Sequence, residues 1–132
     1  MRHLFILLIS AVLFHSCDKK DEQSTDTYII GKCELIEVLA DPGDGSGTFH
    51  SVNSDKIIEF HADGTISSNG SVCYMSVEAN NASIGTYSLE DFTINSSDCS
   101  YSPMYITFEF QGSYLILNYP CIEPCRAKYK KR

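Results

Sequence analysis

The sequence contains no tryptophan, only four prolines and few basic residues. Lysine and arginine together number 10, against 17 aspartates and glutamates in 132 residues. Nucleic-acid binding needs a positive patch, which a chain of this charge lacks, so we expect no nucleic-acid partner. Tyrosine and phenylalanine are plentiful, with eight and seven residues. Aromatic residues of this kind are enriched in β-strands.

No apolar run is long enough to cross a membrane. The longest covers residues 4–14, whereas a spanning helix needs about 20 apolar residues. Arg2 precedes the run and Ser16 follows it, which is the order of charged, apolar and small residues in a secretory signal peptide. We therefore predict that residues 1–16 are a signal peptide that is removed.

Residues that carry catalysis or hold metals are scarce. Removal of the signal peptide would leave only His50 and His61, and neither lies in a nucleophile motif such as G-x-S-x-G. The glycine-rich stretch at residues 41–47 lacks the aspartate order of a calcium loop and the Gly-Lys ending of a phosphate loop. We predict no enzyme, no cofactor and no metal site.

Cys17 resembles the cysteine of bacterial lipoproteins that is linked to diacylglycerol before cleavage. Phe14 and His15 depart from the strict pattern, which favours leucine and a small residue at these positions. The resemblance implies lipidation of Cys17 and attachment to the membrane by a lipid anchor, which is durable when more than one acyl chain is present.

The residues after the cysteine give two conflicting indications of location. Lys20-Asp21-Glu22 resembles a signal for the outer face of the outer membrane, and we predict a surface-exposed, lipid-anchored protein there. Asp18 resembles a retention signal, so a periplasm-facing protein is the alternative.

The rest of the chain divides into a linker and one domain. Residues 17–27 are polar and predict a flexible, lipidated linker, and residues 28–132 are long enough for a single domain with one core. Loss of Arg2 leaves nine basic residues against 17 acidic ones, a net charge of −8, which disfavours broad adhesion to anionic lipid. We expect a monomer.

Five cysteines remain beyond the lipidated one, and an exported chain can oxidise them. Cys121 and Cys125 flank a turn that contains a proline, and Cys73 with Cys99 is the natural second pair. We predict disulfides Cys121–Cys125 and Cys73–Cys99. Because five is odd, Cys33 is left unpaired.

Short apolar runs separated by turns fill the domain. Period-2 alternation is clearest on either side of residues 111–113, and Asp63-Gly64 fits a tight hairpin turn. Strands are predicted at residues 29–39, 56–61, 65–68, 72–77, 84–89, 92–94, 105–110, 114–119 and 126–130. The fold class is therefore all-β, an antiparallel up-and-down barrel of about eight strands, with a two-sheet β-sandwich as the alternative.

Three motifs occur in a recognisable order: Gly31-Lys32-Cys33, FHADGT at residues 60–65, and GTYSL at residues 85–89. With these motifs the chain resembles small lipocalin-like lipoprotein domains, which are eight-stranded barrels, over about residues 28–129. The chain departs from the family at Cys33, where the family has tryptophan. The resemblance implies a binding module that holds a small apolar ligand inside the barrel.

Two interpretations of the function remain open. A barrel of eight strands is filled by its own side chains or holds one small ligand, and the candidate side chains are Cys33, Phe60, Tyr87, Phe108, Phe110 and Tyr119. The alternative is a protein-interaction or inhibitor module that binds an envelope protein through the 41–53 loop and the 121–125 turn. A cavity would favour the first, and a filled barrel with an ordered, protruding 41–53 loop would favour the second.

The C-terminal residues are basic although the chain is acidic: Arg126, Lys128, Lys130, Lys131 and Arg132. Charges of this kind protect an edge strand from pairing with other chains. Contact with anionic headgroups is the alternative interpretation.

Overall fold

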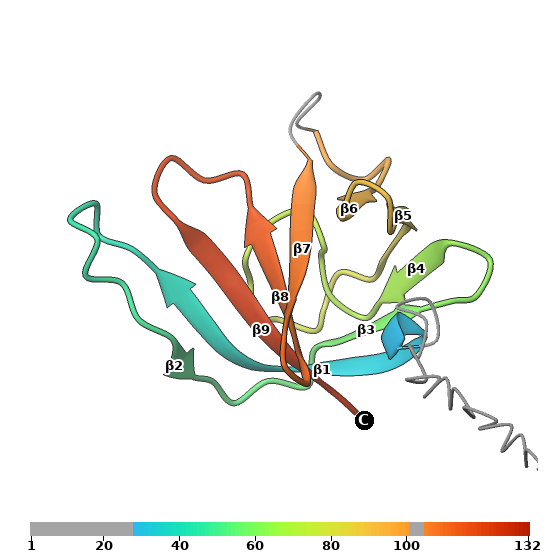
Figure 1. Cartoon of the computed structure of the whole chain (residues 1–132), viewed down its shortest axis with the longest axis horizontal. Helices are drawn as coiled ribbons and strands as arrows, with labels where there is room; N and C mark the ends of the chain where they lie inside the picture. Colours follow the sequence, from blue (N-terminus) through green and yellow to red (C-terminus); the bar gives the residue numbers. More distant parts are fainter. Residues whose placement is uncertain (1–27, 101–104) are drawn as a thin grey trace, which may run out of the picture.

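The computed structural model describes residues 28–100 and 105–132, which form a β-barrel with one extra strand (Figure 1). The predicted signal peptide, the lipidation of Cys17 and the linker at residues 17–27 lie outside the described residues. The described chain contains no helix with the length and hydropathy of a membrane span. Its strands are β1 (Gly31–Ala40), β2 (His50–Ser51), β3 (Ile57–Phe60), β4 (Thr65–Ser68), β5 (Ser83–Ser88), β6 (Thr93–Asn95), β7 (Ile106–Gln111), β8 (Tyr114–Tyr119) and β9 (Cys125–Lys131).

The barrel closes because the first and last strands pair. β1 pairs with β3, each later strand pairs with the next, and β9 returns to β1, all antiparallel. The predicted eight-stranded up-and-down barrel is therefore confirmed in preference to the sandwich. The extra strand, β2, pairs with Glu37 and Val38 of β1. It lies on the same edge of β1 as β3, which pairs with the earlier residues Gly31 to Glu34.

Alternation in the sequence determines which side chains point inward. In β7 and β8 the inward residues include Phe108, Leu115 and Leu117, each no more than 3% exposed, while Glu109 is exposed on the outer face. Burial of each large apolar side chain contributes about 1.5–3 kcal/mol. The hairpin of β3 and β4 follows the same rule around Gly64, whose φ of +83° suits a position that strongly favours glycine.

The strand predicted at residues 72–77 is wrong. This segment belongs to the long connection between β4 and β5. Val72 is buried, but its N–H donates to the side-chain hydroxyl of Ser83 in β5 at 3.1 Å and not to a backbone carbonyl of that strand. Cys73 is bonded to Cys99, so the apolar residues here pack a tethered loop against the barrel.

β9 is not the edge strand that its basic residues suggested. It pairs with β8 on one side and with β1 on the other. Arg126 and Lys128 project from its outer face, where Lys128 forms an ion pair with Glu37 and Arg126 lies 3.8 Å from Glu109. Protection of an edge therefore does not explain these charges.

Both predicted disulfides are present. Cys73 is bonded to Cys99, and Cys121 is bonded to Cys125. Cys33 is buried and free, as predicted. The first disulfide joins the β4–β5 connection to the segment after β6, and the second closes the turn between β8 and β9.

Candidate functional site

The six side chains predicted to face a ligand lie in or against the barrel core. Cys33, Phe60, Phe108 and Tyr119 are buried, and Tyr87 and Phe110 are partly buried. Four of the aromatic rings contact one another edge to face: the ring of Phe60 lies 5.1 Å from that of Tyr87 and 6.1 Å from that of Phe108, and the Phe108 ring lies 6.0 Å from that of Phe110. These contacting rings fill the part of the interior that a ligand would need.

The gap beside Cys33 is small. It is lined by Tyr28, Ile29, Phe110 and Leu115 among others and has a volume of about 10 Å³, which is near the lower limit for one water molecule. The Tyr28 and Phe110 rings lie 5.4 Å apart, so neighbouring aromatic side chains take up space where the resembling family has tryptophan. Burial raises the pKa of the Cys33 thiol to about 11, so it is protonated at neutral pH.

Two tyrosines add polar groups to the interior. Burial raises the pKa of Tyr119 to about 12, and burial together with neighbouring Tyr119 and Cys33 raises the pKa of Tyr129 well above its usual value. The Tyr119 hydroxyl makes no hydrogen bond of good geometry to the described residues. The three groups Cys33, Tyr119 and Tyr129 are thus uncharged at neutral pH.

The two segments of the alternative prediction lie together in the structure. The N–H of Asp41 donates to the carbonyl oxygen of Pro124 at 2.9 Å. A Cβ built on Gly43 would lie 3.3 Å from Oε1 of Glu123, so this side chain lies against the loop backbone. We call the surface made by residues 41–49 and 121–125 the double-loop surface; it lies at the left of Figure 1.

Asp41 organises the first loop. One carboxylate oxygen accepts hydrogen bonds from the N–H groups of Gly43 and Gly45 at 2.7 and 3.0 Å, and the other accepts one from Gly47 at 2.7 Å. The N–H groups of Gly47 and Gly43 are the main reason that the pKa of Asp41 is lowered. A loop rich in glycine is thereby given a defined shape.

The far end of this loop packs on the outer face of β9. Nζ of Lys128 lies 4.1 Å from the centroid of the Phe49 ring and forms an ion pair with Glu37. Contact between a cation and an aromatic face is favourable, most of all where both are partly desolvated. The N–H of Val52 donates to the carbonyl of Ile36 at 3.0 Å, so the chain stays hydrogen-bonded to β1 one residue beyond the end of β2.

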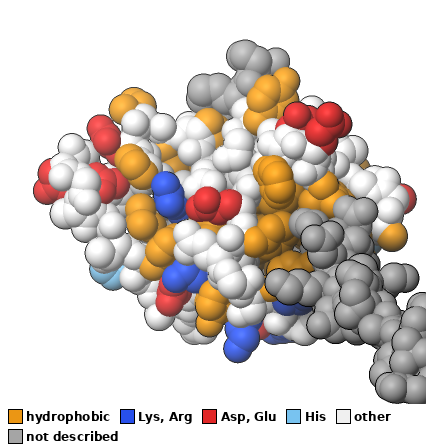
Figure 2. Space-filling model, in the orientation of Figure 1, with side chains coloured by type: hydrophobic (Ala, Val, Ile, Leu, Met, Phe, Trp, Pro, Cys, Tyr) orange, Lys and Arg blue, Asp and Glu red, His pale blue; other side chains and the backbone are white. Residues whose placement is uncertain are grey.

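The second loop presents an apolar side chain to solvent. Ile122 is fully exposed, and it lines an open groove of about 370 Å³ together with Tyr119, Pro124 and Arg126 among others. Acidic side chains gather at this end of the molecule (Figure 2). Ile122 was not among the predicted site residues, although an isoleucine between two bonded cysteines only four positions apart has little opportunity to become buried.

A second open groove lies on the outer face of β4, β5 and β6. Its volume is about 430 Å³, and its lining includes Thr65, Thr86 and Asn95 beside Ile84, which is 67% exposed. Gly85 belongs to the same lining, and β5 and β6 approach closely there, because a Cβ at Gly85 would lie 2.4 Å from the carbonyl oxygen of Asn95.

The two histidines of the described residues, His50 and His61, are paired with hydroxyl groups and not with carboxylates. Nε2 of His61 lies 3.0 Å from the Ser67 hydroxyl, a pair that no motif in the sequence indicates. The carboxylate of Asp63 is bonded to the N–H and hydroxyl of Thr65 instead of to the histidine ring. Within the described ranges, no three His, Cys, Asp or Glu side chains are grouped as a metal site would require.

A scan against protein families and searches of curated proteins and of solved structures found no match to this chain. The resemblance of the three motifs to lipocalin-like lipoproteins therefore stays a prediction, whereas the barrel itself is observed.

Proposed function

We propose that this chain is a lipid-anchored binding module of the cell envelope that binds a protein partner through the double-loop surface. The observation that carries the proposal is the hydrogen bond from Asp41 to Pro124, which joins two distant loops into one surface with Ile122 exposed beside it. The anchor itself rests on the sequence around Cys17.

An exposed isoleucine surrounded by polar groups suits a protein interface. Burial of one such side chain by a partner would contribute about 1.5–3 kcal/mol, and binding energy often concentrates in a few apolar side chains within a polar rim. Asp41, Asp44 and Glu123 give the double-loop surface negative charge. A partner with an apolar pocket and a basic rim would complement this surface.

The order of the loop also supports this function. A loop held by Asp41 and by the contact of Phe49 with Lys128 loses little conformational freedom on binding, so less free energy opposes association. A disulfide restrains the second loop in the same way.

The small apolar ligand of the other interpretation would need space inside the barrel. The rings of Phe60, Phe108 and Phe110 contact one another there, so a ligand must displace them. Carriage of such a ligand stays a prediction. Native mass spectrometry of the protein purified from its own membrane would detect a bound small molecule directly.

A matched pair of substitutions tests the proposed function. Ile122 and Ile84 are both exposed isoleucines on different surfaces, so Ile122→Asp and Ile84→Asp make the same change in the two places. Envelope proteins co-purified with the full, lipidated chain are compared quantitatively among the three proteins. We expect a partner that the original chain and Ile84→Asp retain, and that Ile122→Asp loses about tenfold, the equivalent of 1.4 kcal/mol. Equal retention by both variants would contradict the proposal.

A further inference from the structure

The end of the barrel away from the double-loop surface carries a cluster of basic and tyrosine side chains. Nζ of Lys131 donates to the carbonyl of Tyr28 at 2.8 Å, and the Tyr28 hydroxyl donates to the carbonyl of Gly112 at 3.0 Å. Lys130 pairs across the sheet with Tyr114. We call this end, where the described chain begins and finishes, the basic end. Its members are Tyr28, Lys32, Tyr114, Lys130, Lys131 and Arg132.

We propose that the basic end contacts the anionic phospholipid headgroups of the membrane that holds the Cys17 anchor, and thereby directs the double-loop surface away from the bilayer. The inference rests on the lipid anchor of the proposed function. It concerns a different surface from the one that binds the partner.

The charge of the chain is unevenly distributed. The described residues contain seven basic side chains, and four of them are at the basic end: Lys32, Lys130, Lys131 and Arg132. Glu34 binds Arg132 at 2.9 Å and Glu59 lies 3.8 Å from Lys32, so these two acids offset part of the charge. Lys130 and Lys131 remain exposed, and no carboxylate of the described residues forms a salt bridge with either.

The chemistry of the cluster suits a lipid headgroup. Lysine and arginine side chains near a membrane surface are attracted to anionic lipids over about one Debye length. Tyrosine is enriched at the level of the headgroups because its ring is apolar and its hydroxyl is polar. Tyr114 is 36% exposed next to Lys130 in the sheet, so the two kinds of side chain lie side by side.

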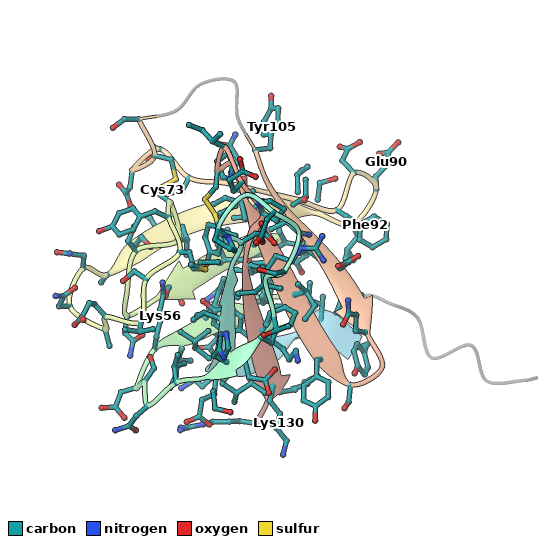
Figure 3. All side chains as sticks on the ribbon, turned by 90° about the vertical axis from the view of Figure 1, so that its left-hand side faces the viewer. Lys56, Cys73, Glu90, Phe92, Tyr105 and Lys130 are labelled. Carbon is teal, nitrogen blue, oxygen red and sulfur yellow. A yellow bond between two sulfur atoms is a disulfide. The ribbon has the colours of Figure 1, made fainter. Side chains whose placement is uncertain are left out.

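The position of the anchor points to the same end. Tyr28, a member of the basic end, follows Cys17 by 11 residue steps, which can span at most about 40 Å of chain. The basic end is therefore held within reach of the headgroups. Figure 3 shows Lys130 at the lower end of the barrel, with Tyr105 at the opposite end.

The two surfaces lie at opposite ends of one strand. β9 begins at Cys125, which belongs to the double-loop surface, and ends at Lys131 in the basic end. Seven residues of extended chain span about 20 Å. Contact of one end with the bilayer would leave the other accessible to a partner.

The absence of tryptophan allows a direct test. Tyr114→Trp and Ile122→Trp each place a single fluorophore, one at each end of the barrel. The full, acylated chain is reconstituted in vesicles of phosphatidylcholine with brominated acyl chains, with or without phosphatidylglycerol. We expect strong quenching for Tyr114→Trp in vesicles that contain phosphatidylglycerol, a loss of that quenching in phosphatidylcholine alone, and no quenching for Ile122→Trp in either.

Lys130 and Arg126 provide the matched control, because both lie on the outer face of β9 but near opposite ends. In the Tyr114→Trp background, Lys130→Gln is expected to reduce the quenching and Arg126→Gln to leave it unchanged. Equal effects of the two changes, equal quenching in both kinds of vesicle, or quenching of Ile122→Trp would overturn the inference. A protein whose mass includes no acyl chains would also overturn it.

These outcomes are separate from those of the partner test. Loss of the partner on Ile122→Asp with no quenching at residue 114 would leave the proposed function supported and overturn only the membrane contact. Quenching at residue 114 with equal partner retention by both isoleucine variants would support the membrane contact and contradict the proposed partner site.

Discussion

The N–H of Asp41 donates to the carbonyl oxygen of Pro124 across 83 positions of sequence. The contact follows from the closure of the barrel, because β1 ends at Ala40, directly opposite Cys125 at the start of β9. The chain therefore leaves β1 and approaches β9 at the same point on the rim. The two loops meet there. The first is held by the carboxylate of Asp41 and the second by the Cys121–Cys125 disulfide.

Replacement of Asp41 by alanine is expected to loosen the first loop without unfolding the barrel. The change removes the acceptors for the N–H groups of Gly43, Gly45 and Gly47, and glycine-rich backbone has much conformational freedom to regain. Amide hydrogen exchange at these glycines should become faster, while exchange in β7 and β8 stays the same. Asp44→Ala is the control, since Asp44 accepts from Ser46 only. Unchanged exchange at the three glycines in Asp41→Ala would contradict this account of the loop.

The two disulfides are expected to differ in their contribution to stability. Cys73–Cys99 closes a loop with a sequence separation of 26, and Cys121–Cys125 one with a separation of 4. Chain entropy alone gives about 3.5 kcal/mol for the longer loop and about 2 kcal/mol for the shorter. Urea unfolding of the two paired Cys→Ser variants should follow that order. A larger loss on removal of Cys121–Cys125 would show that this turn supports the barrel and does not only shape a surface.

Lys56 is expected to make stability rise with pH above neutrality. Its side chain is completely buried, its Nζ donates to the carbonyl of Ser76 at 3.0 Å, and desolvation lowers its pKa from 10.5 to about 8. Below pH 8 the folded and unfolded states both carry the proton, so the cost of the buried charge is fully present. Between pH 8 and 10.5 the unfolded state binds more protons, and the free energy of unfolding increases with pH.

The rise should amount to about 1 kcal/mol between pH 7 and pH 9 in urea unfolding. Cys33 acts in the opposite direction only above its usual value of 9.0, because burial raises its pKa. Lys56→Met should lose the rise, and Lys130→Met, at an exposed lysine, should keep it. The same pH dependence in Lys56→Met and the original chain would show that another group is responsible.

Phe92 is expected to tolerate glycine better than alanine. Its φ of 54° makes it the one residue other than glycine with positive φ in the part of the chain that the structure describes, and its ring lies 5.6 Å from that of Phe108. Both substitutions remove this ring contact. Alanine, like phenylalanine, is destabilised by the left-handed backbone conformation, whereas glycine adopts it without a steric clash. The Phe92→Gly protein should therefore be more stable than Phe92→Ala by about 1 kcal/mol. Thermal unfolding in which alanine is equal to or better than glycine would exclude backbone strain at this position.

The strands could be predicted because alternation is a local property. Phe108, Leu115 and Leu117 can be assigned to the inward face because apolar residues recur at every second position around them. The paired cysteines restrict which other segments can be neighbours in the fold. The same pattern at residues 72–77 was misleading, because a loop held by Cys73 also buries alternate side chains. β2 was not predicted because a strand of two residues is too short to show alternation of apolar and polar side chains.

The candidate site was harder to predict because it depends on long-range register. Nothing near Asp41 indicates that Pro124 is its neighbour, since their contact follows from the pairing of β1 with β9. The sequence nominated both loops for one interaction module but did not indicate that they touch, and the barrel places them in contact. The exposure of Ile122 could have been predicted from its position in a short disulfide loop, but the groove beside it could not.

Site-specific photo-crosslinking in the source cells tests the central claim most directly. A photoreactive phenylalanine analogue replaces Ile122 or, as the control, Ile84 in the full chain, and irradiated cells are examined for adducts whose second component is identified by mass. We predict one dominant protein adduct from position 122 that weakens when Asp41→Ala or the paired Cys121→Ser and Cys125→Ser changes are added, and no such adduct from position 84. The same adduct from both positions, or an adduct from position 84 alone, would contradict the assignment of the double-loop surface as the binding site.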